Sequence, residues 1–351
     1  MRAAIALAAR GRGRTAPNPC VGTVIVKGER AIARARTAAG GAPHSEARAL
    51  ARAGRRARGA TLYVTLEPCA HFGRTPPCVD AVIAARPARV VIGLVDPDPR
   101  TAGRSVRKLR RAGIEVVVGV EAAACARLHE GFVSRVVRGR PFTTLKLAAS
   151  LDGRIATASG ESRWISGEPA RAFVHRLRAA SDAVAVGSNT VLADDPELTA
   201  RRGGRTVHRP TPVVIDSRLR IPAGARLLDG AIVLCSASAP AAKRRRLERA
   251  GARVLAVPAR AGHLDLRSAW RRLGTLGAND LLVEGGGGLA AALLAAGLVD
   301  RLHLFLAPLL IGGDGRPVLG ALRVERLSRA LRPKRLVWHR LGADLHGIVE
   351  W

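Results

Sequence analysis

The segment 60–78, ATLYVTLEPCAHFGRTPPC, decides how the first part of this chain folds. Its first seven residues have the β-branched and aromatic content of a strand, which ends just before Cys69. A turn-rich stretch of eight residues separates Cys69 from Cys78, where a helical pattern begins. Upstream, His44 and Glu46 open another helical pattern. The histidine and both cysteines therefore lie at or just before helix starts, where the helix dipole favours a thiolate.

One histidine and two cysteines form a ligand set that suits zinc. Three protein ligands leave a fourth position for water, as in a catalytic zinc site. Glu46 stands two residues after His44, and zinc-dependent base deaminases carry a non-ligating glutamate there. We expect activated water to attack the amino-bearing carbon of a pyrimidine, while Glu46 moves the proton to the ring and to departing ammonia. The amide of Asn18 is expected to orient the base.

A structural zinc site is the alternative, because His71 in the loop could supply a fourth protein ligand. The gap of eight residues between the cysteines also exceeds the two of the common deaminase pattern. A loop of that length can still return the second thiolate to the metal, so we expect a catalytic site. The remaining cysteines, Cys20, Cys125 and Cys235, are expected to be small buried residues.

The chain has 351 residues and a formal net charge of +31 at pH 7, nearly all from arginine. Such a charge can indicate nucleic-acid binding. Here the arginines are scattered through every segment, and aromatic residues that could stack on bases make up only 3% of the chain. A GC-rich genome, whose codons favour arginine and alanine, explains this composition better, and we expect no nucleic-acid partner.

Cysteine number and hydropathy bear on the cellular compartment. The five cysteines are odd in number and show no disulfide spacing, and the sequence shows no secretory leader. No apolar run approaches the roughly 18 residues of a membrane span. We therefore expect a cytoplasmic protein with no membrane partner, whose reduced thiols can bind metal.

Strand and helix patterns alternate along the chain, which predicts an α/β fold. Before a break at residues 139–141, strands are expected over 20–27, 60–66, 88–95 and 114–118, and helices over 44–53, 78–85, 104–112 and 121–138. After it, strands are expected over 142–150, 182–187, 211–216, 231–235, 253–257, 280–284 and 301–306, and helices over 168–180, 241–250 and 289–296. We expect two domains, 1–140 and 141–351.

These segments together resemble the bifunctional deaminase–reductase family of riboflavin biosynthesis. In the first half the resemblance is carried by TAPNPCVG (15–22), HSE (44–46), YVTLEPCAHFGRTPPC (63–78) and DPDP (96–99). In the second half it is carried by LKLAASLDG (145–153), WIS (164–166), VGSNT (186–190), ADDPELT (193–199) and VEGGG (283–287). The blocks cover essentially the whole chain in the family's order.

The resemblance implies an N-terminal cytidine-deaminase-like α/β/α domain and a C-terminal dihydrofolate-reductase-like α/β domain. It implies that His44, Cys69 and Cys78 bind zinc and that Glu46 is the proton shuttle. The reactions it implies are removal of the 2-amino group from a diaminopyrimidinone ribosyl 5′-phosphate and then NADPH-dependent reduction of the ribosyl group to ribityl. It also implies a homodimer or higher homo-oligomer.

In the second half the family's cofactor positions fall on Ala148, Trp164, Thr190, Asp194, Ser217, Gly286, Gly287 and Gly288. Its substrate positions fall on Ser162, Arg178, Leu198, Arg201 and Glu284. The glycine run follows an expected strand and precedes an expected helix, a place where backbone N–H groups receive phosphate. The forked guanidinium groups of Arg178 and Arg201 suit a substrate phosphate.

The chain departs from the family in three places. It has His-Ser-Glu at 44–46 where the family usually has His-Ala-Glu, it has Gly-Arg-Ser at 103–105 where Gly-Lys-Gly or Gly-Arg-Gly is common, and it begins inside the first family helix. The other functions considered are a nucleic-acid-editing zinc deaminase, a homologue with one half inactive, and a binding protein with a structural zinc. An editing deaminase has no use for a glycine-rich phosphate turn in a second domain, so the two-activity enzyme is the leading hypothesis.

Overall fold

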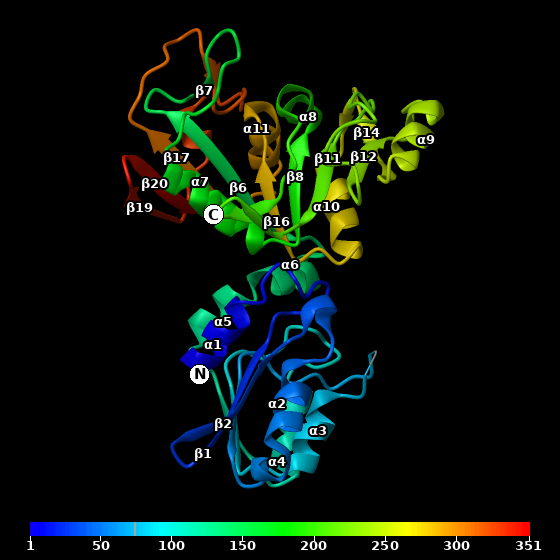
Figure 1. The fold of residues 1–351 in the computed structure, drawn as a ribbon, viewed down its shortest axis with the longest axis vertical. Coiled ribbons are helices and arrows are strands. Elements are labelled where there is room, and N and C mark those ends of the chain that lie inside the picture. Colours follow the sequence, from blue (N-terminus) through cyan, green and yellow to red (C-terminus); the bar gives the residue numbers. More distant parts are fainter. Residues whose placement is uncertain (74) are drawn as a thin grey trace. The chain divides into compact units, whose positions relative to one another are not determined.

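Figure 1 shows the computed structural model of the chain, which describes every residue except Arg74. The chain forms two compact units. The first comprises Met1–Pro141 together with Gly274–Asn279, and the second comprises Phe142–Leu273 together with Asp280–Trp351. The first unit therefore includes a short segment that lies far along the sequence.

The first unit is built on a five-stranded sheet with the order β2-β1-β3-β4-β5. β1 runs antiparallel to its neighbours β2 and β3, whereas β3, β4 and β5 are parallel. The strands are β1 (Gly22–Lys27), β2 (Arg30–Arg36), β3 (Thr61–Val64), β4 (Arg89–Ile92) and β5 (Glu115–Val118). The helices are α1 (Arg2–Ala9), α2 (Ser45–Ala53), α3 (Cys78–Ala85), α4 (Arg104–Arg111), α5 (Ala122–Leu128) and α6 (Glu130–Arg138).

Helices cover both faces of this sheet, as the alternation of β1 shows. Gly22 lies so close to α1 that a Cβ there would stand 2.0 Å from the carbonyl oxygen of Ala4. Its neighbour Thr23 points to the opposite face, where its hydroxyl meets Ser45 of α2. In Figure 1, α2, α3 and α4 group together on that side of the sheet. The result is the expected α/β/α arrangement.

The expected continuous helix over 121–138 is wrong, because it is two helices separated at His129. His129 is buried, and its Nε2 lies 3.1 Å from the hydroxyl oxygen of Thr65, which follows β3. Its φ of −103° and ψ of 10° end α5 and start α6. A long-range contact therefore interrupts a locally helical sequence.

The second unit is built on a nine-stranded sheet with the order β13-β12-β11-β8-β16-β6-β17-β20-β19. Neighbouring strands from β13 to β17 are parallel, and the last two strands form an antiparallel hairpin at the edge. The strands are β6 (Phe142–Ser150), β8 (Ala183–Gly187), β11 (Thr211–Ile215), β12 (Ile232–Ser236), β13 (Arg253–Val257), β16 (Asp280–Glu284), β17 (Arg301–Ala307), β19 (Arg335–Leu341) and β20 (Asp344–Glu350).

Helices and short strand pairs complete the second unit. The helices are α7 (Glu168–Ala179), α8 (Ser188–Asp194), α9 (Ala241–Arg249), α10 (Leu266–Thr275) and α11 (Gly287–Ala295). The short pairs are β7 (Arg154–Ala156) with β18 (Arg316–Pro317), β9 (Ala200–Arg202) with β10 (Arg205–His208), and β14 (Ala259–Arg260) with β15 (His263–Leu264).

Two apolar clusters lie on opposite faces of the large sheet. Along β8, Ala183 and Ala185 belong to one cluster and Val184 and Val186 to the other, as strand alternation requires. Trp270 of α10 is fully buried in the first cluster, and its indole N–H donates to Thr143 Oγ1 at 2.7 Å. Parallel strands buried on both faces explain why these segments read as continuous apolar runs. Among the described residues, no helix has the length and apolar content that a membrane crossing requires.

Candidate metal centre and cofactor site

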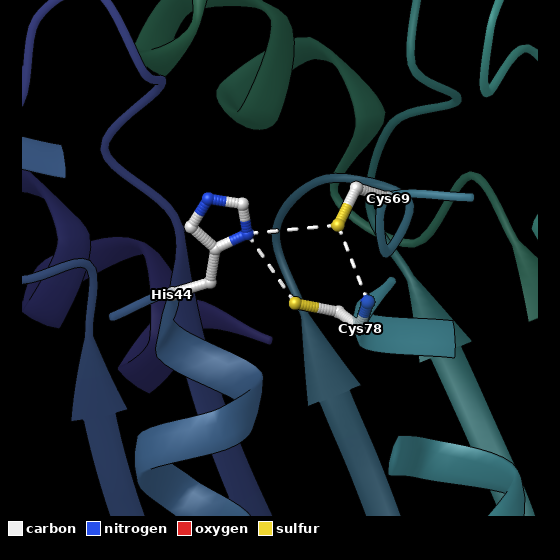
Figure 2. A group of neighbouring side chains, drawn as sticks. All are labelled: His44, Cys69 and Cys78. Atoms are coloured by element: carbon white, nitrogen blue, oxygen red, sulfur yellow. Dashed lines mark hydrogen bonds between the residues drawn. The ribbon is translucent and has the colours of Figure 1, made fainter. Parts of the chain in front are cut away.

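Three side chains of the first unit converge at the ends of their elements (Figure 2). His44 is the N-cap of α2, Cys78 is the first residue of α3, and Cys69 lies in the loop after β3. His44 Nδ1 is 3.6 Å from Cys69 Sγ and 3.3 Å from Cys78 Sγ. Ligand atoms of a tetrahedral zinc with bonds of roughly 2.0–2.3 Å stand about 3.3–3.8 Å apart. The His44 nitrogen therefore stands at the spacing that zinc requires from both sulfurs, and all three ligand atoms lie within 4.8 Å of one another.

The charges of the two cysteines also fit a divalent metal. The hydrogen bond from the Cys78 side chain lowers the pKa of the Cys69 thiol to about 4, and the backbone N–H of Cys78 donates to Cys69 Sγ at 3.2 Å. The same thiol hydrogen bond, followed by burial, raises the pKa of Cys78. One thiolate forms readily and the second needs a cation beside it, which is what a zinc ion supplies.

His71, the alternative fourth ligand, does not join this group. Among the described residues, His44, Cys69 and Cys78 are the one cluster of three or more potential ligands within reach of a single ion. The His71 Nδ1 instead lies 3.2 Å from the hydroxyl oxygen of Thr101. A three-ligand site leaves a coordination position for water, which favours a catalytic metal over a structural one.

Glu46 is buried in the first turn of α2, with a relative exposure of 3%. Burial raises the pKa of its carboxyl group, which makes the carboxylate a stronger base near neutral pH. The Glu46 carboxylate lies against the ligand group. The pKa of Cys78 is raised first by the hydrogen bond with Cys69, then by burial, and then by the negative charge of Glu46. This position is suitable for proton transfer without metal ligation.

A cavity of about 130 Å³ opens beside the ligand group. It is lined by Pro17, Asn18, Gly40, Ala42, His44, Cys69, His71, Gly73 and Thr75. The Asn18 amide donates to the carbonyl of Gly41 at 2.8 Å and lies 3.4 Å from His44 Nε2. Gly41 has a φ of +85°, and a Cβ there would come within 2.9 Å of the Asn18 amide, so this position requires glycine. Asn18 therefore lines the cavity, and its predicted contact with the base stays a prediction.

Glu67 supports the turn that carries Cys69, and the sequence did not reveal this role. Its buried carboxylate accepts four backbone N–H bonds, from Asp96, Gly103, Ser105 and Val106, at 2.9–3.3 Å. Three of these donors lie at the start of α4, where N–H groups have no partner within the helix. Ser105 Oγ in turn donates to the carbonyl of Pro68 at 2.6 Å. The peptide before Cys69 is thereby tied to α4.

In the second unit, the predicted cofactor residues follow the carboxyl ends of neighbouring parallel strands. Thr190 and Asp194 are on α8 after β8, Ser217 follows β11, and the glycine run follows β16. Ala148 is on β6, the other neighbour of β16. Ligands of open parallel sheets bind at this edge. Trp164 lies in the loop before α7, 70% exposed, with the Arg171 guanidinium 4.8 Å from its ring centre.

The three glycines at the start of α11 differ in their surroundings. Gly286 is the N-cap, and Gly287 and Gly288 are the first helical residues. A Cβ on Gly287 would stand 2.8 Å from the carbonyl oxygen of Pro317, so Gly287 is required for close backbone packing. Gly286 and Gly288 have open space where a Cβ would lie. They leave room for a phosphate at the helix start.

A cavity of about 370 Å³ begins at Ser217. It is lined by Ser217, Arg218, Ser236, Ser238, Ala239, Pro240, Lys243, Ala259 and Gly262. Arg218 and Lys243 give it positive charge, and three serines supply hydroxyl groups. Only Ser217 was predicted, because the two cations could not be told apart among the 58 lysines and arginines of the chain.

The predicted substrate residues Arg178 and Glu284 form a two-pronged ion pair, with N–O distances of 2.6 and 2.8 Å. Arg178 also donates to the carbonyl of Thr199 at 3.0 Å. Burial acts to raise the pKa of Glu284, but the charge and hydrogen bonds of Arg178, together with the nearby charges of Lys146 and His175, outweigh burial and the pKa is lowered. Lys146, the β6 residue that pairs with Glu284 in register, completes the cluster, and burial lowers its pKa. A lysine within an apolar strand was the overlooked signal for this residue.

The remaining predicted substrate residues are on nearby segments of the second unit. Arg201 donates to Thr199 Oγ1 at 3.2 Å and pairs with Glu197. Leu198 is buried and has a φ of +55°. Ser162 is half-buried in the loop between β7 and α7. Their contacts with substrate stay predictions.

A metal-ligand trio beside a buried glutamate, and a parallel sheet with a glycine-rich helix start, define a zinc-dependent deaminase joined to a reductase. Two family models match these parts of the chain. Residues 1–94 match the cytidine and deoxycytidylate deaminase zinc-binding region, and residues 141–346 match the RibD C-terminal domain. The chain belongs to the RibD family of bifunctional riboflavin biosynthesis enzymes.

Relatives match the chain over nearly its whole length. The riboflavin biosynthesis protein RibD of Escherichia coli K12 is 43% identical, over 98% of this chain and 96% of that protein. The solved structure of Acinetobacter baumannii RibD is 39% identical with a TM-score of 0.90, over 99% of this chain and 97% of that one. A Thermotoga maritima diaminohydroxyphosphoribosylaminopyrimidine deaminase/5-amino-6-(5-phosphoribosylamino)uracil reductase is 34% identical with a TM-score of 0.85, over 100% and 97%.

Family membership confirms the predicted fold class, the pairing of a deaminase with a reductase, and their place in riboflavin biosynthesis. It also confirms the two expected cofactors, zinc for the first part and NADPH for the second. A match that spans both halves favours the two-activity enzyme over an editing deaminase or a zinc-stabilised binding protein.

Proposed function

We propose that the first unit deaminates a diaminohydroxyphosphoribosylaminopyrimidine and that the second reduces the resulting 5-amino-6-(5-phosphoribosylamino)uracil, converting its ribosyl group to ribityl. The deamination and the reduction are the two reactions in the name of the Thermotoga relative, and the conversion of ribosyl to ribityl is what the family resemblance implies. The observation that carries the proposal is the His44–Cys69–Cys78 group, which lies against buried Glu46 and beside a cavity of about 130 Å³. The boundary between the activities is proposed near residue 140.

His44, Cys69 and Cys78 would hold the zinc of the first unit. Zinc bound there supplies an activated water as nucleophile at neutral pH. Glu46 would take one proton from the water and deliver it to the ring nitrogen, and would then carry a second proton, from the added hydroxyl group, to the amino group that leaves as ammonia. Asn18 lines the cavity, and its amide is held by the hydrogen bond that it donates to the carbonyl of Gly41. In this position the amide would orient the pyrimidine.

For the second unit we propose that NADPH lies along the carboxyl-terminal edge of the parallel strands. The open positions at Gly286 and Gly288 would accept its phosphates at the start of α11. The cavity at Ser217 would take the adenosine end, and Arg218 and Lys243 supply charge for the extra phosphate of NADPH. Ala148, Trp164, Thr190 and Asp194 are the further cofactor residues that the family resemblance supports.

The reductase substrate is proposed to bind around Glu284. Arg178 holds this carboxylate in one orientation, and Lys146 lies beside it on the neighbouring strand. Ser162, Leu198 and Arg201 are the other substrate residues that the family resemblance supports. A phosphorylated pyrimidine is thus the small-molecule partner, and we propose neither a nucleic-acid nor a membrane partner. The same resemblance supports a homodimer or higher homo-oligomer, and the five free cysteines support a reducing compartment, which we propose is the cytoplasm.

The test follows ammonia release and NADPH oxidation together in the full chain. Glu46→Gln should lower ammonia release by about 10²–10⁴-fold, the usual contribution of a general acid–base. Reduction of the separately supplied deaminated intermediate should be unchanged. Glu115→Gln, in an exposed ion pair with Arg89, is the matched control and should retain both activities. If Glu46→Gln impairs both reactions equally, the assignment of separate sites is wrong.

A further inference from the structure

Ser45 stands between the metal ligand His44 and the proposed shuttle Glu46, and it is completely buried. Its hydroxyl donates to Glu46 Oε2 at 2.8 Å. The hydroxyl oxygen of Ser45 also lies 2.7 Å from Thr23 Oγ1, on β1. Thr23 is also completely buried, so three polar groups meet in a place that solvent does not reach.

Counting hydrogens fixes the direction of these bonds. An ionised carboxylate accepts but cannot donate, so the single hydroxyl hydrogen of Ser45 goes to Glu46. Ser45 then has only lone pairs to offer Thr23, and the Thr23 hydroxyl must donate to Ser45. The result is a directed chain from Thr23 through Ser45 to Glu46. Successive hydrogen bonds of this kind polarise and strengthen one another in a buried setting.

The chain leaves the two oxygens of Glu46 unequal. Oε2 already receives the Ser45 hydrogen, and a proton arriving there would compete with it. Resting on the proposed shuttle role of Glu46, we propose that Ser45, backed by Thr23, is a positioning residue that fixes the Glu46 carboxylate and directs proton transfer to Oε1. A carboxylate held in one rotamer meets the water and the ring in the same geometry at each turnover.

This chain is well suited to a test by substitution. Ser45 is in the first turn of a helix, and alanine is the best helix former, so Ser45→Ala removes one hydroxyl while the helix is kept. Thr23→Val removes the second hydroxyl and keeps the β-branched shape that suits a strand.

In the full chain, Ser45→Ala should lower kcat for ammonia release about five- to twentyfold and leave KM within twofold. Thr23→Val should lower kcat about two- to fivefold. The double variant should be no slower than Ser45→Ala within twofold, because Thr23 acts only through Ser45. Reduction of the deaminated intermediate, carried by the same molecules, should be unchanged in all three variants.

Zinc retention separates positioning from damage to the metal site. Each variant should retain as much zinc as the wild type when incubated with the same concentration of chelator. A substitution that only disturbed the structure of α2 would instead lower the zinc content. An unchanged kcat in Ser45→Ala, multiplied effects in the double variant, or zinc loss in step with kcat would each overturn the proposal. Glu46→Gln in parallel distinguishes the two levels: if it stays active, the shuttle role fails, and if it is inactive while Ser45→Ala is not impaired, only this inference fails.

Discussion

Glu67→Gln should loosen α4 and the turn before Cys69 although it changes only one atom of the side chain. Glu67 Oε1 accepts N–H groups from Ser105 and Val106 at 3.0 and 3.2 Å. Glu67 Oε2 accepts those of Asp96 and Gly103 at 3.3 and 2.9 Å. A glutamine retains one of these acceptors and turns an NH₂ group toward the other pair of donors.

The size of the effect follows from the two donors left without an acceptor. A buried unsatisfied donor costs about 1–3 kcal/mol, so two cost about 2–6 kcal/mol before the structure relaxes. We expect about 3 kcal/mol after relaxation, which corresponds to roughly a hundredfold increase in local opening. The free energy lost is local, because all four donors lie in the segment 96–106.

Hydrogen exchange read by mass spectrometry is the suitable measurement. All four tryptophans, at 164, 270, 338 and 351, lie in the second unit, so their fluorescence does not report on α4. Peptides covering 96–111 should exchange about a hundredfold faster in Glu67→Gln, and zinc should be released to chelator sooner. Glu115→Gln, about half exposed, should exchange like the wild type. If the peptides covering 96–111 exchanged at the wild-type rate in Glu67→Gln, the Glu67 carboxylate would not hold α4 in place.

Two further predictions concern the metal and the dependence on pH. Removing zinc with a chelator should abolish ammonia release and leave the rate of reduction of the deaminated intermediate within twofold. Added zinc should restore ammonia release and added Mg²⁺ should not, because thiolate ligands disfavour Mg²⁺. If both activities were lost together, the assignment of the metal to the first unit would be wrong. In the second unit, burial and then the charge of His346 lower the pKa of His303 to about 3. His303 takes up a proton near pH 6.5 in the unfolded chain but only near pH 3 in the folded one. The free energy of unfolding is therefore undiminished above pH 6.5 and falls as the pH drops toward 3. Between pH 7 and pH 5 this residue should lower the free energy of unfolding by about 2 kcal/mol. In urea unfolding followed by tryptophan fluorescence, the decrease in the free energy of unfolding from pH 7 to pH 5 should be about 2 kcal/mol smaller in His303→Gln than in the wild type. Equal decreases in the two proteins would contradict the lowered pKa of His303.

Much of the fold could be predicted because local patterns determine it. The helix at Cys78–Ala85 and the strands Phe142–Ser150 and Asp280–Glu284 have the bounds that the sequence predicted. β2 was missed because its sequence, RAIARAR, contains three arginines, at positions 30, 34 and 36, and charged side chains are typical of an edge strand. The C-terminal hairpin of β19 and β20 was missed as well, and many β19 side chains are exposed.

The metal ligands could be predicted because the chemistry depends on residue types at short spacings. His44 and Glu46 are two residues apart, and the two cysteines flank one loop, so their convergence needs only one strand and two helix starts. The residues that hold them could not be found in this way. Glu67 reaches α4 across more than thirty residues, and Ser45 meets Thr23 on a strand twenty-two residues away.

The sequence by itself therefore determined the class of chemistry: a zinc ligand set, a proton-shuttling glutamate, and a glycine-rich helix start after a strand. These depend on residue identity and on local periodicity, which are written in neighbouring positions. Only the tertiary structure decided how that chemistry is oriented and supported. It brought Thr23 to Ser45, closed Arg178 onto Glu284, and placed Arg218 and Lys243 at one cavity among many other cations. The physical reason is that burial and hydrogen-bond direction arise from contacts between distant segments, which no local pattern contains.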